Sequence, residues 1–90
     1  MITHIRGRLV EKHPDHVVVE CNGLGYFVVI SLQTFSNLPD QENIHLVTHQ
    51  VIREDAHILY GFYSKTEREI FKLLLSVSGV GPSTAITMLS

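Results

Sequence analysis

The dipeptide Asn22-Gly23 places the strongest local constraint on this chain of 90 residues. It stands between two apolar, β-branched runs, and a two-residue type I′ turn needs positive φ at both central positions, which Asn and Gly tolerate best. The dipeptide therefore predicts a hairpin that joins residues 16–21 to residues 26–31. Gly25 follows two positions later and suggests a bulge or a strained start to the second strand.

Further short apolar runs surround this hairpin and indicate a small all-β unit. The expected strands are residues 2–10, 16–21, 26–31, 44–52 and 57–62. Leu32, Phe35 and Leu38 recur at a spacing of three, which favours a short helix between the third and fourth strands. Five strands with a helix in that position have the connectivity of an OB-fold barrel, and a plain five-stranded meander is the rival interpretation.

The hydrophobic period changes from two to about 3.6 after Phe62, so helices are expected to follow the strands. Ser64 and Glu67 have the spacing of a capping box, which predicts a helix start. The apolar stripe of this helix is expected to consist of Ile70, Phe71, Leu73, Leu74 and Val77. We expect Gly79 to end the helix as a left-handed C′ residue and Pro82 to open the next helix.

The chain is thus expected to be mainly β with C-terminal helices, divided into residues 1–63 and residues 64–90. Its apolar pattern is still running where the second helix stops, which we interpret as a truncation. Neither a signal-peptide core nor a run of about 20 apolar residues occurs, so we expect a cytoplasmic protein without membrane contacts. The single Cys21 fits a reducing compartment and is interpreted as a core residue.

Charge gives no simple case for nucleic-acid binding, because nine acidic residues outnumber seven basic ones and the net charge is -2. Local features remain candidates. One is the loop from Arg53 to Ala56, where Arg53 could contact phosphate while Glu54 and Asp55 repel it, a combination suited to steering DNA. A polar, solvated loop tip is the simpler interpretation of the same residues.

The second candidate feature is the short connection around Gly79 and Gly81. Both glycines lack the Cβ atom that would keep a ligand away, and the first N–H groups of the following helix are unpaired. A DNA phosphate could bind these N–H groups with help from the helix dipole. An ordinary helix–helix turn, with Gly at C′ and Pro at N1, is again the simpler interpretation.

The six histidines do not predict a metal site. His13 and His16 flank a turn, and His45 and His49 share a strand face about 13 Å apart, too far to hold one ion. Structural zinc needs four close ligands. We therefore expect no metal and no cofactor, and no motif for a catalytic nucleophile or a nucleotide is present in the sequence.

Several segments together resemble the RuvA family, whose members are bacterial subunits that bind Holliday junctions. They are Met1-Ile2 with Arg6-Gly7, Asn22-Gly23-Leu24-Gly25-Tyr26, Thr48-His49, Arg53-Glu54-Asp55-Ala56, Leu59-Tyr60-Gly61-Phe62 and Gly79-Val80-Gly81-Pro82. These segments follow one another along essentially the whole chain.

The resemblance implies an OB-fold domain at 1–63 and the first, incomplete helix-hairpin-helix of a second domain at 64–90. It implies a homotetramer around an open four-way DNA junction, with Glu54 and Asp55 as an acidic pin at the crossover. The phosphate contacts are then expected at Arg53, Gly79, Val80, Gly81 and Ser83. Ser83 stands where the family often has lysine, so we expect a weaker contact with DNA phosphate at this position.

The resemblance also implies a noncatalytic subunit that loads the RuvB ATPase through a C-terminal domain absent from this chain, while the RuvC nuclease cleaves the junction. A competing hypothesis is an OB-fold module that binds single-stranded nucleic acid or protein. Its candidate stacking residues are Tyr26, Phe27, Tyr60 and Phe62. A third hypothesis is a small metal-dependent enzyme that uses histidines with Glu54 and Asp55.

Overall fold

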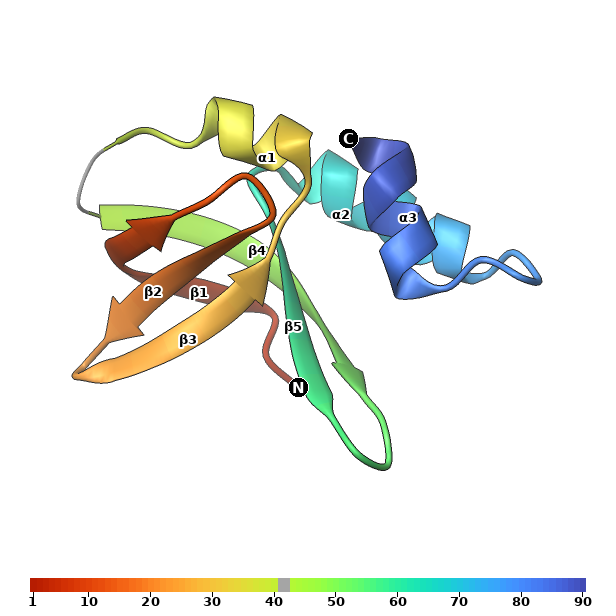
Figure 1. Cartoon of the computed structure of the whole chain (residues 1–90), viewed down its shortest axis with the longest axis horizontal. Helices are drawn as coiled ribbons and strands as arrows, with labels where there is room; N and C mark the ends of the chain where they lie inside the picture. The colour runs from red at the N-terminus through yellow and green to blue at the C-terminus, as the bar shows by residue number, and fades with distance from the viewer. Residues whose placement is uncertain (41–42) are drawn as a thin grey trace.

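The computed structural model describes residues 1–40 and 43–90. The strands are β1 (His4–Lys12), β2 (His16–Cys21), β3 (Leu24–Val29), β4 (Asn43–Ile52) and β5 (His57–Phe62), and the helices are α1 (Leu32–Asn37), α2 (Lys65–Leu75) and α3 (Pro82–Leu89). Figure 1 shows α1 across one end of the strands, with α2 and α3 packed beside them. Among the described residues, no helix combines the length and apolar character needed to cross a bilayer.

The five strands close into a barrel in the order β1-β2-β3-β5-β4. Neighbouring strands are antiparallel except β3 and β5, which pair in parallel through Val28 with Leu59 and Val29 with Tyr60. Closure gives each of the five strands two neighbours. The order and the helix between β3 and β4 confirm the predicted OB-fold, and the meander interpretation is wrong because β3 pairs with β5.

The hairpin predicted from Asn22-Gly23 is confirmed. Asn22 has φ 51° and Gly23 has φ 85°, so both central turn residues are left-handed as a type I′ turn requires. The expected irregularity at Gly25 is wrong, because β3 already begins at Leu24 and Gly25 pairs regularly with Glu20. The two-residue turn sets Leu24 directly opposite Cys21 and leaves no extra residue, and the bulge lies instead in β1.

Two buried clusters organise the molecule. The first fills the barrel and contains Ile5, Val17, Val19, Val28, Ile30, Leu38, Ile44, Leu46 and Leu59. The second cluster, called the junction core below, contains Val47, Tyr60, Phe62, Phe71 and Ala85 and lies between the barrel and the two C-terminal helices. The rings of Phe62 and Phe71 are 5.0 Å apart between centroids. Burial of these aromatic rings fixes α2 and α3 against the barrel.

Helix α2 begins where the capping signal predicts, since Ser64 Oγ accepts a hydrogen bond of 3.1 Å from the Glu67 amide. The Glu67 carboxylate, however, points inward and accepts hydrogen bonds from the hydroxyls of Ser31 and Thr34. Because this orientation turns Glu67 and Phe71 toward the barrel, part of the predicted apolar stripe is wrong. Its members Ile70, Leu73 and Val77 are exposed.

The predicted end of this helix is also wrong in position. Helix α2 ends at Leu75, with Ser76 as its C-cap, because the Ser76 amide and hydroxyl both donate to the Leu73 carbonyl. Gly79 does have the expected positive φ, at 85°. It serves a separate turn, which is closed by a bond of 3.1 Å from the Val80 amide to the Val77 carbonyl.

Candidate nucleic-acid interface

The end of the β4–β5 hairpin extends beyond the rest of the barrel (Figure 1). Strand β4 pairs with β1 only as far as Val47, whereas its pairing with β5 continues to Ile52 and His57. Strand β5 in turn pairs with β3 only at Leu59 and Tyr60. The outer residues 51–58 therefore form a ribbon of two strands, which we call the projecting ribbon.

The tip of the projecting ribbon is a tight loop that carries two carboxylates. The Arg53 amide donates to the Ala56 carbonyl at 2.7 Å and the Ala56 amide donates back at 3.4 Å. Glu54 and Asp55 lie between them and are exposed, and within residues 1–40 and 43–90 their carboxylates form no ion pair or side-chain hydrogen bond. Two unneutralised negative charges at a protruding tip repel any other anion that approaches it.

Arg53 lies at the base of this loop, and its side chain is exposed. Its guanidinium is close enough to Tyr60 to affect that phenol: burial raises the pKa of Tyr60, and the positive charge of Arg53 opposes the rise. The tip loop thus carries one cation beside two anions. The structure brings these three predicted residues together.

The second predicted element is the turn between α2 and α3. Gly79, Gly81 and Ser83 are exposed, while Val80 is half-buried against the junction core. The first helical bond of α3 runs from the Ala85 amide to the Gly81 carbonyl at 2.9 Å. No acceptor among the described residues takes the amide hydrogen of Ser83 or Thr84, so both N–H groups remain available to an anion.

The fold does not require glycine at position 81. Gly81 has φ -92° and ψ 175°, an extended conformation open to any residue, and an added Cβ would meet nothing within 4 Å. Gly79 differs, because its positive φ alone favours glycine. The absence of a side chain at Gly81 therefore leaves the backbone at the start of α3 open to close approach from outside.

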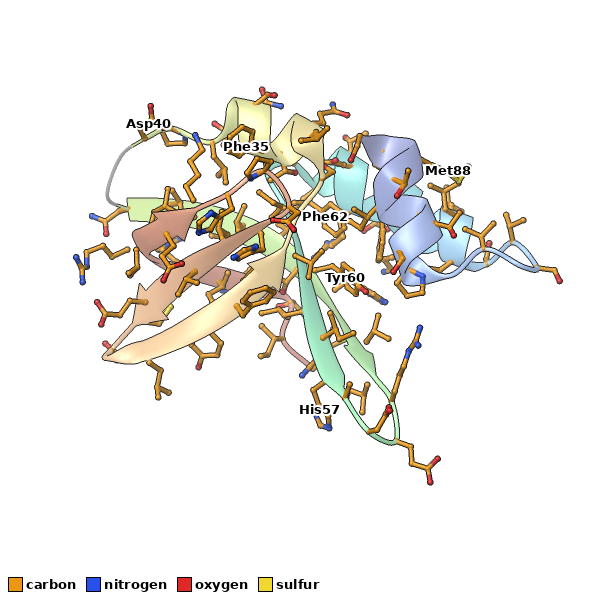
Figure 2. All side chains as sticks on the ribbon, in the orientation of Figure 1. Phe35, Asp40, His57, Tyr60, Phe62 and Met88 are labelled. Atoms are coloured by element: carbon orange, nitrogen blue, oxygen red, sulfur yellow. The ribbon has the colours of Figure 1, made fainter. Side chains whose placement is uncertain are left out.

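The projecting ribbon and the α2–α3 turn are supported by the same buried cluster. Val51 and Ile58 of the ribbon and Val80 of the turn all pack against the junction core. Figure 2 shows Tyr60 and Phe62 between the barrel and the helices, at the base of both elements. The relative positions of the two candidate contact elements are thus set by tertiary packing.

A cationic pocket lies at the boundary of β1, β4 and α2, and sequence reasoning missed it. It is lined by Thr3, His4, His45, Val47, Lys65 and Arg68. Desolvation by burial lowers the pKa of His45, and the positive charges of Arg6, His4 and Lys65 lower it further. Because a concentration of positive charge attracts anions, the pocket is a further candidate contact for phosphate.

The strand pattern contains the signal for this pocket. Arg6 pairs with His45 across the β1–β4 ladder, and His4 is two residues from Arg6 on the same strand face. Recognising the cluster, however, needs the β1–β4 pairing, because these strands are about 40 residues apart in the sequence. The contribution of α2, through Lys65 and Arg68, requires the tertiary structure.

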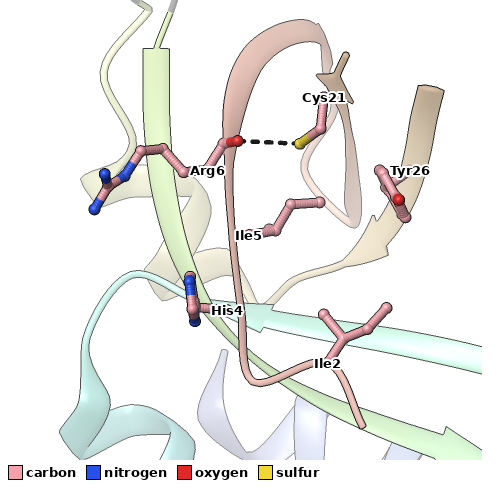
Figure 3. Close-up of a pocket in the computed structure, with 6 residues that line it drawn as sticks. All are labelled: Ile2, His4, Ile5, Arg6, Cys21 and Tyr26. Carbon is pink, nitrogen blue, oxygen red and sulfur yellow. Dashed lines mark hydrogen bonds between the residues drawn. The ribbon is translucent and has the colours of Figure 1, made fainter. Parts of the chain in front are cut away.

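Most of the aromatic residues proposed as stacking platforms cannot serve that role. Tyr60 is 4% exposed and Phe62 is fully buried. Tyr26 is half-buried and lines an open pocket with Cys21, whose thiol donates to the Arg6 carbonyl at 3.0 Å (Figure 3). Only Phe27 of the four is open to solvent, with 59% of its surface exposed.

The metal-dependent enzyme hypothesis finds no support at the ribbon tip. Glu54 and Asp55 belong to no group of three potential metal ligands in the described part of the chain. Their loop also lacks a neighbouring pocket among those found between described residues.

Comparison with known proteins supports the resemblance to the RuvA family that the sequence segments indicate. Residues 1–61 match the RuvA N terminal domain family. A protein of Christiangramia forsetii named Holliday junction branch migration complex subunit RuvA is 60% identical over 90 residues, which is the whole of this chain and 47% of that protein. Proteins with the same name from Flavobacterium psychrophilum and Polaromonas sp. are 59% and 55% identical, again across the whole chain.

The chain spans about half the length of these curated relatives, 47% or 48% in each case. The family match covers the strands of the barrel almost to the end of β5. The identities extend beyond it through both C-terminal helices, so the barrel and the helical part are related to the same proteins. The chain belongs to the RuvA family.

Proposed function

We propose that this protein is a noncatalytic DNA-binding subunit that holds a four-way junction open for branch migration. The observation that carries the proposal is the projecting ribbon with Glu54 and Asp55 at its exposed tip. The curated relatives carry the name of a subunit of a Holliday junction branch migration complex. In such a role the acidic tip would repel DNA phosphates at the centre of the junction.

The acidic tip acts by repulsion. Four ribbons around the centre of a junction would bring several carboxylates close to the strand crossover, where they repel phosphates and help to separate the strands. A continuous duplex crossing the centre would meet the same repulsion. Glu54 and Asp55 therefore act as an acidic pin that favours an open junction over linear duplex.

Attraction comes from other parts of the chain. The free N–H groups at the start of α3 and the exposed Gly79 and Gly81 suit a backbone phosphate, with Val80 holding the turn and Ser83 adding a hydroxyl. Arg53 supplies a cation at the base of the tip loop. These contacts address the DNA backbone and not the bases, so recognition depends on the shape of the DNA and not on its sequence.

Within this proposal the chain has two functional parts. Residues 1–63 form the OB-fold domain with the pin, and residues 64–90 form the first helix-hairpin-helix of a second domain. The active assembly is a homotetramer around the junction, which works with the RuvB ATPase as motor and the RuvC nuclease as resolving enzyme.

The test is a competition experiment across a salt series with a synthetic four-way junction, linear duplex and single strand of equal length. The proposal expects the junction to compete best. The double variant Glu54→Gln with Asp55→Asn should improve duplex binding relative to the junction. Asp40→Asn removes an exposed carboxylate at the far end of the molecule (Figure 2) and should leave the ratio unchanged.

Two outcomes would contradict the proposal. If the double variant and the parent discriminate equally between junction and duplex, Glu54 and Asp55 do not act as a pin. A preference for single strand would favour the alternative OB-fold function, for which the exposed ring of Phe27 provides the one specific observation. Phe27→Ala would then abolish that preference.

A further inference from the structure

A cluster of potential metal ligands lies where β1 turns into β2. Glu11, His13 and His16 each offer one ligand atom, and these atoms all lie within 4.8 Å of one another. The sequence pattern alone predicts no metal site, because His13 and His16 only flank a turn and structural zinc needs four close ligands. Glu11 joins them because it is two residues from His13, on the same side of the extended chain.

The backbone and the neighbouring rings hold this cluster in place. The His13 amide donates to the His16 carbonyl at 2.9 Å, which fixes the two ends of the turn. The His16 ring stacks on His13 at 4.5 Å and on Phe27 at 4.3 Å between centroids. The turn and the His16 ring therefore have defined positions before any ion arrives, which lowers the entropic cost of binding.

Asp15 controls which nitrogen of His16 is free. Its carboxylate Oδ1 lies 2.8 Å from His16 Nδ1, and since a carboxylate can only accept, the proton of the neutral ring is on Nδ1. The lone pair is then on Nε2, where it can bind a cation. A carboxylate behind a histidine ligand is the usual support of zinc-bound imidazole.

His13 and Glu11 are already paired, with His13 Nε2 3.1 Å from Glu11 Oε1. A metal ion would take the place of the proton between these two atoms, and the neutral His13 ring would carry its proton on Nδ1 instead. The intervening Lys12 does not compete, because its ammonium donates at 3.0 Å to both the Leu38 carbonyl and Asp40. The cationic group between the two ligands in sequence is thus bound on the other side of the strand.

We propose that Glu11, His13 and His16 bind a divalent transition-metal ion, for which Zn²⁺ is the best match, and that Asp15 is a positioning residue. Two imidazoles and one carboxylate form a donor set that zinc accepts with bonds of about 2.0–2.2 Å. The ligand atoms must move somewhat closer together. The side chains of Glu11 and His13, 56% and 47% exposed, are free to do so. Water completes the coordination.

The experiment titrates Zn²⁺ into metal-free protein in competition with a chromogenic chelator. We expect one ion per chain with micromolar affinity, weakened at least about tenfold by His13→Gln or His16→Gln, which each remove one ligand. Asp15→Ala should weaken binding by about tenfold to a hundredfold, the effect of losing the carboxylate behind a ligand. His57→Gln is the matched control, because His57 is exposed at the start of β5 and lies outside the cluster.

A second measurement locates the ion. Paramagnetic Co²⁺ should broaden the NMR signals of residues 11–16 and Phe27 and leave the rest of the barrel sharp. Broadening centred on His4 and His45, whose rings are 5.6 Å apart, would overturn the assignment. The absence of binding at micromolar Zn²⁺, or equal affinity in the parent and in folded His13→Gln and His16→Gln variants, would overturn the proposal itself.

Discussion

Removing the buried carboxylate of Glu67 is expected to destabilise the protein more than any exposed charge change on the same helix. Glu67 is 4% exposed and accepts hydrogen bonds from Ser31 and Thr34. Thr34 Oγ1 also accepts from the Tyr63 amide at 3.2 Å. This network therefore joins the N-terminus of α1, the start of α2 and the end of β5.

The magnitude follows from the groups that Glu67→Ala would leave unpaired. Two buried hydroxyls lose their acceptor, at about 1–3 kcal/mol each. We therefore expect a loss of about 2–6 kcal/mol in the free energy of unfolding. For a domain of this size, each kcal/mol shifts Tm by about 4–8 °C, so Tm should fall by roughly 10 °C or more. Glu67→Gln keeps the shape and one acceptor, and should cost about 1–2 kcal/mol.

Urea denaturation followed by circular dichroism measures these differences. Glu69→Ala is the control, because Glu69 is exposed on the same helix and, among the described residues, pairs only with Arg68 and Lys72. Its removal should change stability by about 0.5 kcal/mol or less. A cycle with Thr34→Val tests the contact directly, with an expected coupling of about 0.5–3 kcal/mol. The reasoning is refuted if Glu67→Ala is no more destabilising than Glu69→Ala.

Four further predictions concern the core, the α2–α3 turn and pH. Gly61→Ala would place a Cβ 2.5 Å from Val28 Cγ1 and should lower the free energy of unfolding by about 1–3 kcal/mol. Gly81→Ala, measured by the same urea denaturation, should leave stability nearly unchanged and weaken junction binding. Phe71→Ala empties the centre of the junction core and should cost about 3–5 kcal/mol. Desolvation lowers the pKa of both His45 and His49 below the usual histidine value of about 6.5. The folded state thus binds fewer protons than the unfolded state, so stability should be full above about pH 6.5 and fall as the solution is acidified further; a flat profile between pH 7 and pH 5 would contradict this.

Local sequence signals predicted the elements whose determinants are close in sequence. Asn22-Gly23 sets the hairpin through its own backbone preferences, and Ser64 caps α2 through a residue three positions away. Glu67 shows the limit of such signals. The spacing that predicts its capping role says nothing of its carboxylate, because the hydroxyls that bind it belong to Ser31 and Thr34, more than 30 residues earlier.

The same limit applies to the candidate sites. The residues of the ribbon tip are consecutive, so the sequence alone places Arg53, Glu54 and Asp55 in one loop. The cationic pocket depends on which strand lies beside which. The cluster of Glu11, His13 and His16 is local in sequence, but the side-chain geometry of the turn is needed to see that its ligand atoms lie within 4.8 Å of one another. The rotation of α2 likewise follows from the partners of Glu67 and Phe71, so its exposed apolar residues could not be separated from its buried ones by periodicity alone.

The net charge of -2 indicates that this chain selects DNA more by repelling phosphates at the acidic tip than by attracting DNA through basic side chains. A protein that bound DNA mainly through lysine and arginine would release many counterions, and its affinity would fall steeply with salt. Contacts from backbone N–H groups at the start of α3 release few counterions. Junction binding by this chain should therefore vary less with salt than that of a basic DNA-binding protein. Its discrimination against duplex should be strongest at low salt, where the repulsion from Glu54 and Asp55 is least screened.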